Sequence, residues 1–99
     1  MVYSTLTIGT KVGVRLKGVE HLKKFCAWVE KKYDIPAQVL GNVVGMVYQN
    51  HVMLEFKDME HFEKFNDKLL SDPEYTAWFK EGSDLLEWAG VVQHVYNVL

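Results

Sequence analysis

Residues 51–70 read HVMLEFKDMEHFEKFNDKLL and change their hydrophobic spacing part-way along. The first part alternates, with apolar side chains at Val52, Leu54 and Phe56, which is the period of a half-buried strand. The spacing then becomes three and four, in a stripe formed by Met59, Phe62, Phe65, Leu69 and Leu70. Asp58 stands between the two patterns and is a favourable N-cap residue. This stretch therefore predicts a strand followed directly by an amphipathic helix.

An earlier stretch shows the same succession of strand and helix. Residues 6–16 alternate, and one side of the pattern is formed by Leu6, Ile8, Val12, Val14 and Leu16. Residues 19–33 then carry apolar side chains at helical spacing, namely Leu22, Phe25, Cys26, Val29 and Tyr33. Lys17-Gly18 separates the two patterns. Pro36 ends the helix, because the residue before a proline avoids helical backbone angles.

A second strand is predicted over residues 37–48, between the first helix and the strand that begins at residue 51. One of its faces carries Val39, Val43 and Val47. The other face carries Leu40, Val44, Met46 and Tyr48. Both faces are therefore partly apolar, and Gln49-Asn50 is the predicted hairpin turn.

The C-terminal third contains three further signals. Ser71-Asp72-Pro73-Glu74 has the pattern of a capping box with a proline close to the first helical position, so it predicts a restarted helix. Residues 83–89 predict a last short helical piece, which Gly90 ends. Residues 91–98 then form the final strand.

Strand, helix, two strands, helix and strand thus follow one another within 99 residues. This order predicts an α+β, ferredoxin-like fold, in which a four-stranded antiparallel sheet carries its helices on one face. The helices share that face because crossover connections between strands are right-handed. The length suits a single domain over residues 1–99.

Composition indicates a soluble globular protein, with 48% hydrophobic and 24% charged residues. The 11 Lys and Arg residues are outnumbered by 13 Asp and Glu, and Arg15 is the only arginine, so we expect no nucleic-acid partner. Apolar runs are too short to span a membrane and the N-terminus lacks a signal-peptide pattern, so no membrane partner is expected. Cys26 is the only cysteine. It excludes an internal disulfide and favours a reducing, cytoplasmic location.

The sheet face without helices needs a cover. Four strands spaced about 4.8 Å apart and about 17–20 Å long present on the order of 350 Å² in projection. The last strand puts Val91 and Val95 on one side and Val92, Tyr96 and Val98 on the other, so an apolar set faces away from the helices in either register. A patch of this size predicts a homodimer through the open sheet face. The alternative is that the valines reflect β-propensity alone.

Two local motifs accompany this order of elements: Phe56-Lys57-Asp58-Met59-Glu60, and the stretch LLSDPEYTAWF at residues 69–79. With them the chain resembles the dimeric α+β barrel superfamily. That superfamily includes antibiotic-biosynthesis monooxygenases, haem-degrading monooxygenases, NIPSNAP-like proteins and stress-responsive A/B-barrel proteins. The resemblance implies a dimer whose eight strands form a barrel, with a ligand cavity between each sheet and its own helices.

The sequence departs from the haem-degrading branch of that superfamily. The branch has an Asn in the first strand, a Trp near the end of the third strand and a His on the second helix. Here residues 6–16 contain no Asn, Phe56 stands where the Trp is expected, and no His occurs between residues 62 and 93. These departures argue against haem breakdown.

His94 is the best candidate for a catalytic residue, although the sequence assigns no catalytic role with certainty. A buried imidazole on the last strand can act as a general base or orient a substrate carbonyl. It shares a strand face with Val92, Tyr96 and Val98. The sequence leaves open whether that face meets the helices or the dimer partner, and whether His94 is only a structural hydrogen-bonding residue.

The other histidines carry weaker signals. His51 and Glu55 share a face of the third strand and resemble an acid/base couple or half of a metal site. A metal requires a third convergent ligand, which the sequence does not supply, so we expect no metal and favour a solvated strand. His21 and His61 are expected at the surface or at the rim of a site.

Four aromatic side chains are candidates to line a cavity with His94: Tyr48, Phe56, Trp88 and Tyr96. Alternatively, these rings only fill the core. The first interpretation predicts binding of a small hydrophobic or aromatic molecule between sheet and helices, by a cofactor-independent monooxygenase or isomerase. The second predicts a non-catalytic ligand-binding or structural dimer module. A third hypothesis is a larger oligomer that associates through exposed Trp28 and Trp78.

Overall fold

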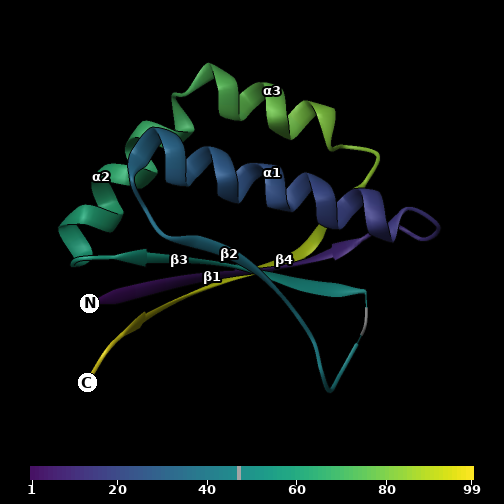
Figure 1. Cartoon of the computed structure of the whole chain (residues 1–99), viewed down its shortest axis with the longest axis horizontal. Coiled ribbons are helices and arrows are strands. Elements are labelled where there is room, and N and C mark those ends of the chain that lie inside the picture. Colours follow the sequence, from purple (N-terminus) through teal and green to yellow (C-terminus); the bar gives the residue numbers. More distant parts are fainter. Residues whose placement is uncertain (47) are drawn as a thin grey trace.

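The computed structural model describes residues 1–46 and 48–99. Its elements follow in the order β1 (Val2–Thr10), α1 (Arg15–Tyr33), β2 (Ala37–Gly41), β3 (Gln49–Phe56), α2 (Met59–Leu70), α3 (Pro73–Glu81) and β4 (Leu86–Asn97). The strands form one antiparallel sheet in the order β2-β3-β1-β4. All three helices lie on one side of this sheet (Figure 1). The α+β ferredoxin-like fold predicted from the order of elements is confirmed.

The core lies between the sheet and the helices. Alternate residues of β1 and β3 point into it, and the pairs Val2 with Phe56 and Leu6 with Val52 set the register. The stripe of α1 packs onto them with Leu22, Phe25, Cys26 and Val29, and α2 adds Phe65 and Leu69. The odd-numbered residues of β1 and β3 therefore face the helix-free side.

The first strand lies further toward the N-terminus than its alternation predicts. β1 ends at Thr10, and α1 begins at Arg15, so the predicted continuation of the strand to residue 16 was wrong. Gly13 turns the chain with a φ of 84°, and the N–H of Gly18 donates to the carbonyl of Val14. The strand stops here because both of its partner strands begin at this level: β3 begins at Gln49 opposite Gly9, and β4 begins at Leu86 opposite Thr10.

β2 is shorter than predicted for the same reason. It ends at Gly41, whose partner Asn50 lies within β3 and is not part of a turn. Val43 and Val44 lie in the connection between β2 and β3 and are 100% and 90% exposed. Their spacing is that of a strand, but neither residue pairs with another strand. Val47 of the predicted strand lies outside the described residues.

The segment before the last strand is also different from the prediction. Leu85 and Leu86 both donate their N–H to the carbonyl of Gly82, so the chain makes a turn and enters β4 at Leu86 instead of forming a helix. Pairing with β1 extends the strand back to this point and overrides the local helical pattern. Gly90 has a φ of 81° and lies where the register with β1 shifts, which lets Trp88 and Val91 both pack against the core.

Two of the predicted helix starts are confirmed. Asp58 caps α2 by accepting the N–H of His61 at 2.8 Å. Asp72, the residue after Ser71 in the predicted motif, caps α3 by accepting the N–H of Glu74 at 2.9 Å, with Pro73 at the first position. No helix within the described residues has the length and apolar character that crossing a bilayer requires.

Candidate ligand cavity

A cavity of about 240 Å³ lies between the sheet and the helices. All three helices and the strands β1, β3 and β4 contribute to its wall. Most of its lining is apolar or aromatic: Leu6, Phe25, Val52, Leu54, Phe62, Phe65, Leu69, Leu70, Tyr75 and Trp88. Its polar lining comes from Ser4, Asn66 and Gln93.

One residue of the lining, Trp88, carries a buried hydrogen-bond donor without a partner in the described part of the chain. The indole Nε1 of Trp88 is buried and, within the part of the chain that the structure describes, makes no hydrogen bond. A buried donor without a partner costs about 1–3 kcal/mol, so native structures rarely keep one without a reason. Close by in the lining, Gln93 donates from Nε2 to the hydroxyl of Ser4 at 3.1 Å. The cavity therefore combines an apolar wall with a few fixed polar groups, which is the usual construction of a small-molecule site.

The lining carries no charged side chain among the residues described. Tyr75 is its titratable group, and burial raises the pKa of that phenol. The phenol is thus neutral near neutral pH, and its cavity suits an uncharged molecule, because nothing in the wall would compensate a buried ion. Residues 1–46 and 48–99 also contain no cluster of three His, Cys, Asp or Glu side chains placed to hold a metal ion.

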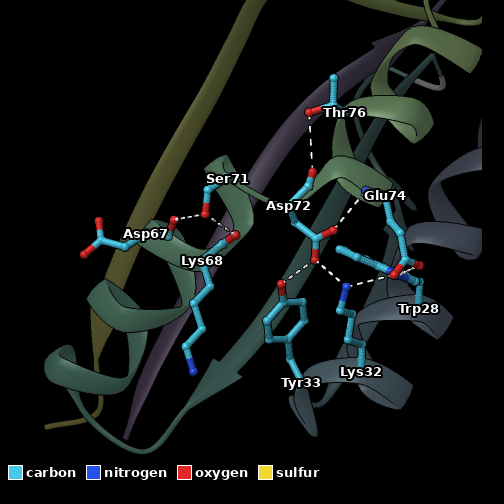
Figure 2. Close-up of polar contacts among 9 residues, drawn as sticks. All are labelled: Trp28, Lys32, Tyr33, Asp67, Lys68, Ser71, Asp72, Glu74 and Thr76. Atoms are coloured by element: carbon cyan, nitrogen blue, oxygen red, sulfur yellow. Dashed lines mark hydrogen bonds and ion pairs between the residues drawn. The ribbon is translucent and has the colours of Figure 1, made fainter.

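The first turn of α3, which carries Tyr75, is held on α1 by a polar cluster around Asp72 (Figure 2). The buried Asp72 carboxylate accepts from Lys32 at 2.8 Å and from the Tyr33 hydroxyl at 2.6 Å, besides the N–H of Glu74. Lys32 and Tyr33 together hold the pKa of this carboxyl down at about 2. Lys32 also pairs with the Glu74 carboxylate at 2.8 Å.

The second turn of α3 is held on α1 by stacked rings. The imidazole of His21 and the indole of Trp78 lie 4.6 Å apart with planes 3° from parallel. Trp28, nearer the other end of α1, donates to Glu74 at 2.9 Å. Both Trp28 and Trp78 are half-buried and donate hydrogen bonds within the chain, so they are less exposed than expected; the larger oligomer itself stays a prediction. Their role is to fix α3, which in turn places Tyr75 on the cavity.

The structure separates the five residues predicted to share a site. Trp88 borders the sheet–helix cavity. Phe56 is 1% exposed and packs against Phe62 and Phe65, with ring centroids 5.2 and 5.4 Å away. It fills the core next to the cavity and does not line it. His94 and Tyr96, in contrast, lie on the other face of the sheet.

The register of β4 places His94 on the helix-free side. It pairs with Thr5 of β1, and its ring stacks with that of Tyr96 at 5.9 Å. Both residues are exposed. Tyr48 borders an open groove of about 960 Å³ near the C-terminal end of β1, together with Gln49 and Glu87. His94, Tyr96 and Tyr48 therefore do not reach the cavity in which Trp88 lies.

His51 and Glu55 do not contact each other as a couple. The His51 ring meets the Thr7 hydroxyl at 2.8 Å through Nδ1 and the side-chain oxygen of Asn42 at 2.7 Å through Nε2. Glu55 accepts from the Tyr3 hydroxyl at 2.9 Å, which raises the pKa of that phenol. Each residue is thus part of a separate hydrogen-bonded group on the helix-free face.

Sequence reasoning missed the polar residues of the cavity. Ser4 occupies an inward position of β1, four residues before Ile8, but the alternation used to find this strand began at Leu6. Gln93 lies between Val91 and Val95 on the inward side of β4. A polar residue at an inward position of an otherwise apolar strand is the signal that would have identified both.

Solved structures with this arrangement are known. An uncharacterized NIPSNAP domain protein from Burkholderia xenovorans superimposes with a TM-score of 0.82 at 13% identity, over 100% of this chain and 95% of its own. A candidate antibiotic biosynthesis monooxygenase from Nitrosomonas europaea gives 0.75 at 10% identity, over 100% and 99%. Another from Deinococcus radiodurans gives 0.74 at 11%, over 99% and 92%. The chain has the fold of these proteins.

The predicted resemblance to NIPSNAP-like proteins and antibiotic-biosynthesis monooxygenases thus holds for the fold. No protein-family model matches the sequence. No curated protein matches it either. At identities of 10–13% the likeness carries no residue-level assignment, so the function has to be argued from the cavity itself.

Proposed function

We propose that this protein binds a small, uncharged, apolar or aromatic molecule in the cavity between its sheet and its helices. The unpaired Nε1 of Trp88 is the observation that carries this proposal. A ligand oxygen that accepts from this indole would satisfy the buried donor, while Leu6, Phe62 and Tyr75 surround the hydrocarbon part. The ligand is therefore a molecule with one or two rings and a carbonyl-type acceptor.

The volume limits the size of that molecule. Drug-sized ligands occupy pockets of about 300–1,000 Å³, and the cavity of about 240 Å³ lies just below this range. Leu70 also borders the cavity and is 73% exposed, so it marks the side on which the cavity approaches the surface. A two-ring molecule entering past Leu70 would fill most of the space.

Two probes with the same carbon skeleton test the proposal. 1-Tetralone has a carbonyl and tetralin does not, so isothermal titration calorimetry should show tighter binding of the ketone by about tenfold, the worth of one hydrogen bond to a buried donor. Trp88→Phe removes the donor and should abolish this preference while leaving tetralin binding in place. Trp28→Phe is the matched control, because its indole already donates to Glu74 at the surface.

Binding of neither probe by the wild-type protein would contradict the proposal. An equal preference for the ketone in wild type and Trp88→Phe would show that Trp88 is not the donor. The alternative of a purely structural dimer module predicts the first of these results, with a cavity that no ring compound enters.

A second candidate function is catalysis in the same cavity, as a cofactor-independent monooxygenase or isomerase. The observation that favours it is the fold shared with the candidate monooxygenases from Nitrosomonas europaea and Deinococcus radiodurans. An enol or enolate of a carbonyl compound is the intermediate to test for in both chemistries. The neutral Tyr75 phenol cannot remove the proton, but it can donate a hydrogen bond to the carbonyl oxygen and stabilise the enolate while water or hydroxide takes the proton. Tyr75 is the titratable side chain in the described lining, so it is the residue to test.

Exchange of the α-hydrogens of 2-tetralone in D₂O measures this step directly. Catalysis predicts faster exchange with wild-type protein than with buffer, and loss of the acceleration in Tyr75→Phe. Tyr33→Phe is the control, because the Tyr33 phenol is outside the cavity and bonds to Asp72. Exchange at the buffer rate would leave the protein as a binding module without chemistry.

We also propose that the helix-free face joins two copies into a homodimer. This face presents Leu40, Met53, Val92 and Tyr96 among threonines and histidines, and Val92 and Tyr96 are 44% and 51% exposed. It is more polar than the sequence suggested, because Val43 and Val44 lie off the sheet. A reducing compartment such as the cytoplasm suits the unpaired, buried Cys26.

A further inference from the structure

The connection between β2 and β3 begins with an apolar arm, defined here as residues Asn42–Met46. Val43 and Val44 are 100% and 90% exposed, and Met46 is 55% exposed. The connection leaves the sheet on the side opposite the helices (Figure 1). Large apolar side chains gathered in one exposed segment mark an interaction surface.

Hydrogen bonds give this arm a definite shape. The side chain of Asn42 donates to the carbonyl of Met46 at 2.8 Å and accepts from Nε2 of His51 at 2.7 Å. Nε2 must carry the proton, because the amide oxygen can only accept, and Nδ1 then accepts from the Thr7 hydroxyl. The arm is thereby tied to the helix-free face of β1 and β3. The side chain of Asn42 is engaged in these hydrogen bonds, and the side chains of Val43 and Val44 are exposed to solvent.

We propose that this arm packs against a second copy of the chain and extends the sheet-to-sheet interface. The inference rests on the homodimer proposed above. With strands of 9, 5, 8 and 12 residues, a rise of about 3.3 Å per residue and a spacing of about 4.8 Å, the face presents on the order of 500 Å² in projection, which is less than the roughly 800 Å² per partner that a standard stable interface buries. The arm is continuous with that face and can supply part of the missing area.

The chemistry of the arm fits burial in such an interface. Asn42, Val43, Val44, Gly45 and Met46 include no charged residue, and the core of an interface is depleted in charge and enriched in methionine. Gly45 has a φ of 118°, a backbone conformation that favours glycine, so the arm turns at this residue. A preformed arm of this kind loses little conformational freedom on association.

Sedimentation equilibrium over a wide range of protein concentration tests the proposal. Val43→Ser/Val44→Ser should raise the dimer dissociation constant at least tenfold relative to wild type, because two apolar side chains lose their burial. Leu16→Ser/Met59→Ser is the matched control, since both side chains are exposed on helices, Leu16 on α1 and Met59 on α2, and neither lines the cavity. It should leave the constant unchanged, and the unfolding temperatures of the isolated chains should stay close to that of wild type.

Each result has a distinct meaning. A wild-type dimer that the arm variant forms equally tightly would overturn the arm proposal and leave the sheet-face dimer standing. A wild-type chain that stays monomeric at every concentration would overturn both. A monomer that sediments with phosphatidylcholine–phosphatidylserine vesicles, and loses this binding in Val43→Ser/Val44→Ser, would assign the arm to a lipid surface and overturn the second-copy proposal.

Discussion

His21 and Trp78 are joined by two reciprocal hydrogen bonds. Nε2 of His21 donates to the carbonyl of Trp78, and Nε1 of Trp78 donates to the carbonyl of His21, each at 2.9 Å. Their rings stack between these bonds, and His21 is only 3% exposed. Because α1 and α3 are 57 residues apart at this point in the sequence, the pair fixes tertiary structure and not local structure.

Trp78→Phe should lower the free energy of unfolding by about 1–3 kcal/mol, because it removes the partly buried hydrogen bond to the carbonyl of His21 and part of the ring that stacks on the imidazole. Urea unfolding followed by circular dichroism measures the change. Trp28→Phe is the comparison, since its indole bonds to the exposed Glu74 and should cost less. Equal losses of unfolding free energy in the two variants would show that the His21–Trp78 pair stabilises the fold no more than the exposed bond between Trp28 and Glu74.

Gly82→Ala should destabilise the protein, because the added Cβ would overlap Nε2 of His21. The imidazole must then leave its place against Trp78, and we expect a loss of about 1–3 kcal/mol, typical of overpacking. Gly41→Ala is a suitable control, since nothing lies within 4 Å of its Cβ position. Thermal unfolding that is unchanged in Gly82→Ala would mean that His21 can shift without cost.

Acid should weaken the protein between about pH 4 and pH 2 through Asp72. The bonds to Lys32 and Tyr33 lower the pKa of this carboxyl from 3.8 to about 2 in the folded chain. The unfolded chain therefore binds the proton first, so the stabilising contribution is complete above pH 4 and is lost as the pH falls toward 2. Asp72→Asn should flatten this part of the profile, measured as urea midpoints from pH 2 to 6. A profile as steep as that of wild type would exclude Asp72 as its source.

The Cys26 thiol should react slowly with Ellman's reagent in the native protein. Burial raises its pKa to about 11, so very little thiolate is present near neutral pH, and the side chain is 5% exposed. Unfolding in urea should restore the rate of an ordinary cysteine. Rapid reaction of the native protein would show that α1 opens readily from the sheet.

The sequence was sufficient for elements whose signals are local. β3 and α2 were predicted because alternation, an N-cap at Asp58 and helical spacing follow one another within one stretch. Strand ends were not predictable, because they depend on where a partner stops: Val43, Val44 and Val12 have strand-forming side chains but no strand beside them. The residues just before Gly90 likewise have helical spacing, but from Leu86 on they belong to β4 because this strand pairs with β1.

The candidate site was harder to predict than the fold. His21 was expected at the surface and is buried, because its partner Trp78 belongs to a helix far along the sequence. Trp88, which was expected either to line a cavity or to fill the core, borders the sheet–helix cavity, and its role in binding stays a prediction. His94 was not placed, since the register shift in β4 decides which face it occupies and no local pattern reveals that shift.

The indole N–H resonance of Trp88 in a ¹⁵N–¹H correlation spectrum tests the central proposal most directly. Titration with 1-tetralone should move this resonance progressively and saturably, while tetralin moves it far less and the indole resonance of Trp28 stays in place. A Trp88 resonance that neither compound shifts, in a protein whose fold is otherwise intact, would contradict the assignment of the sheet–helix cavity as a ligand site.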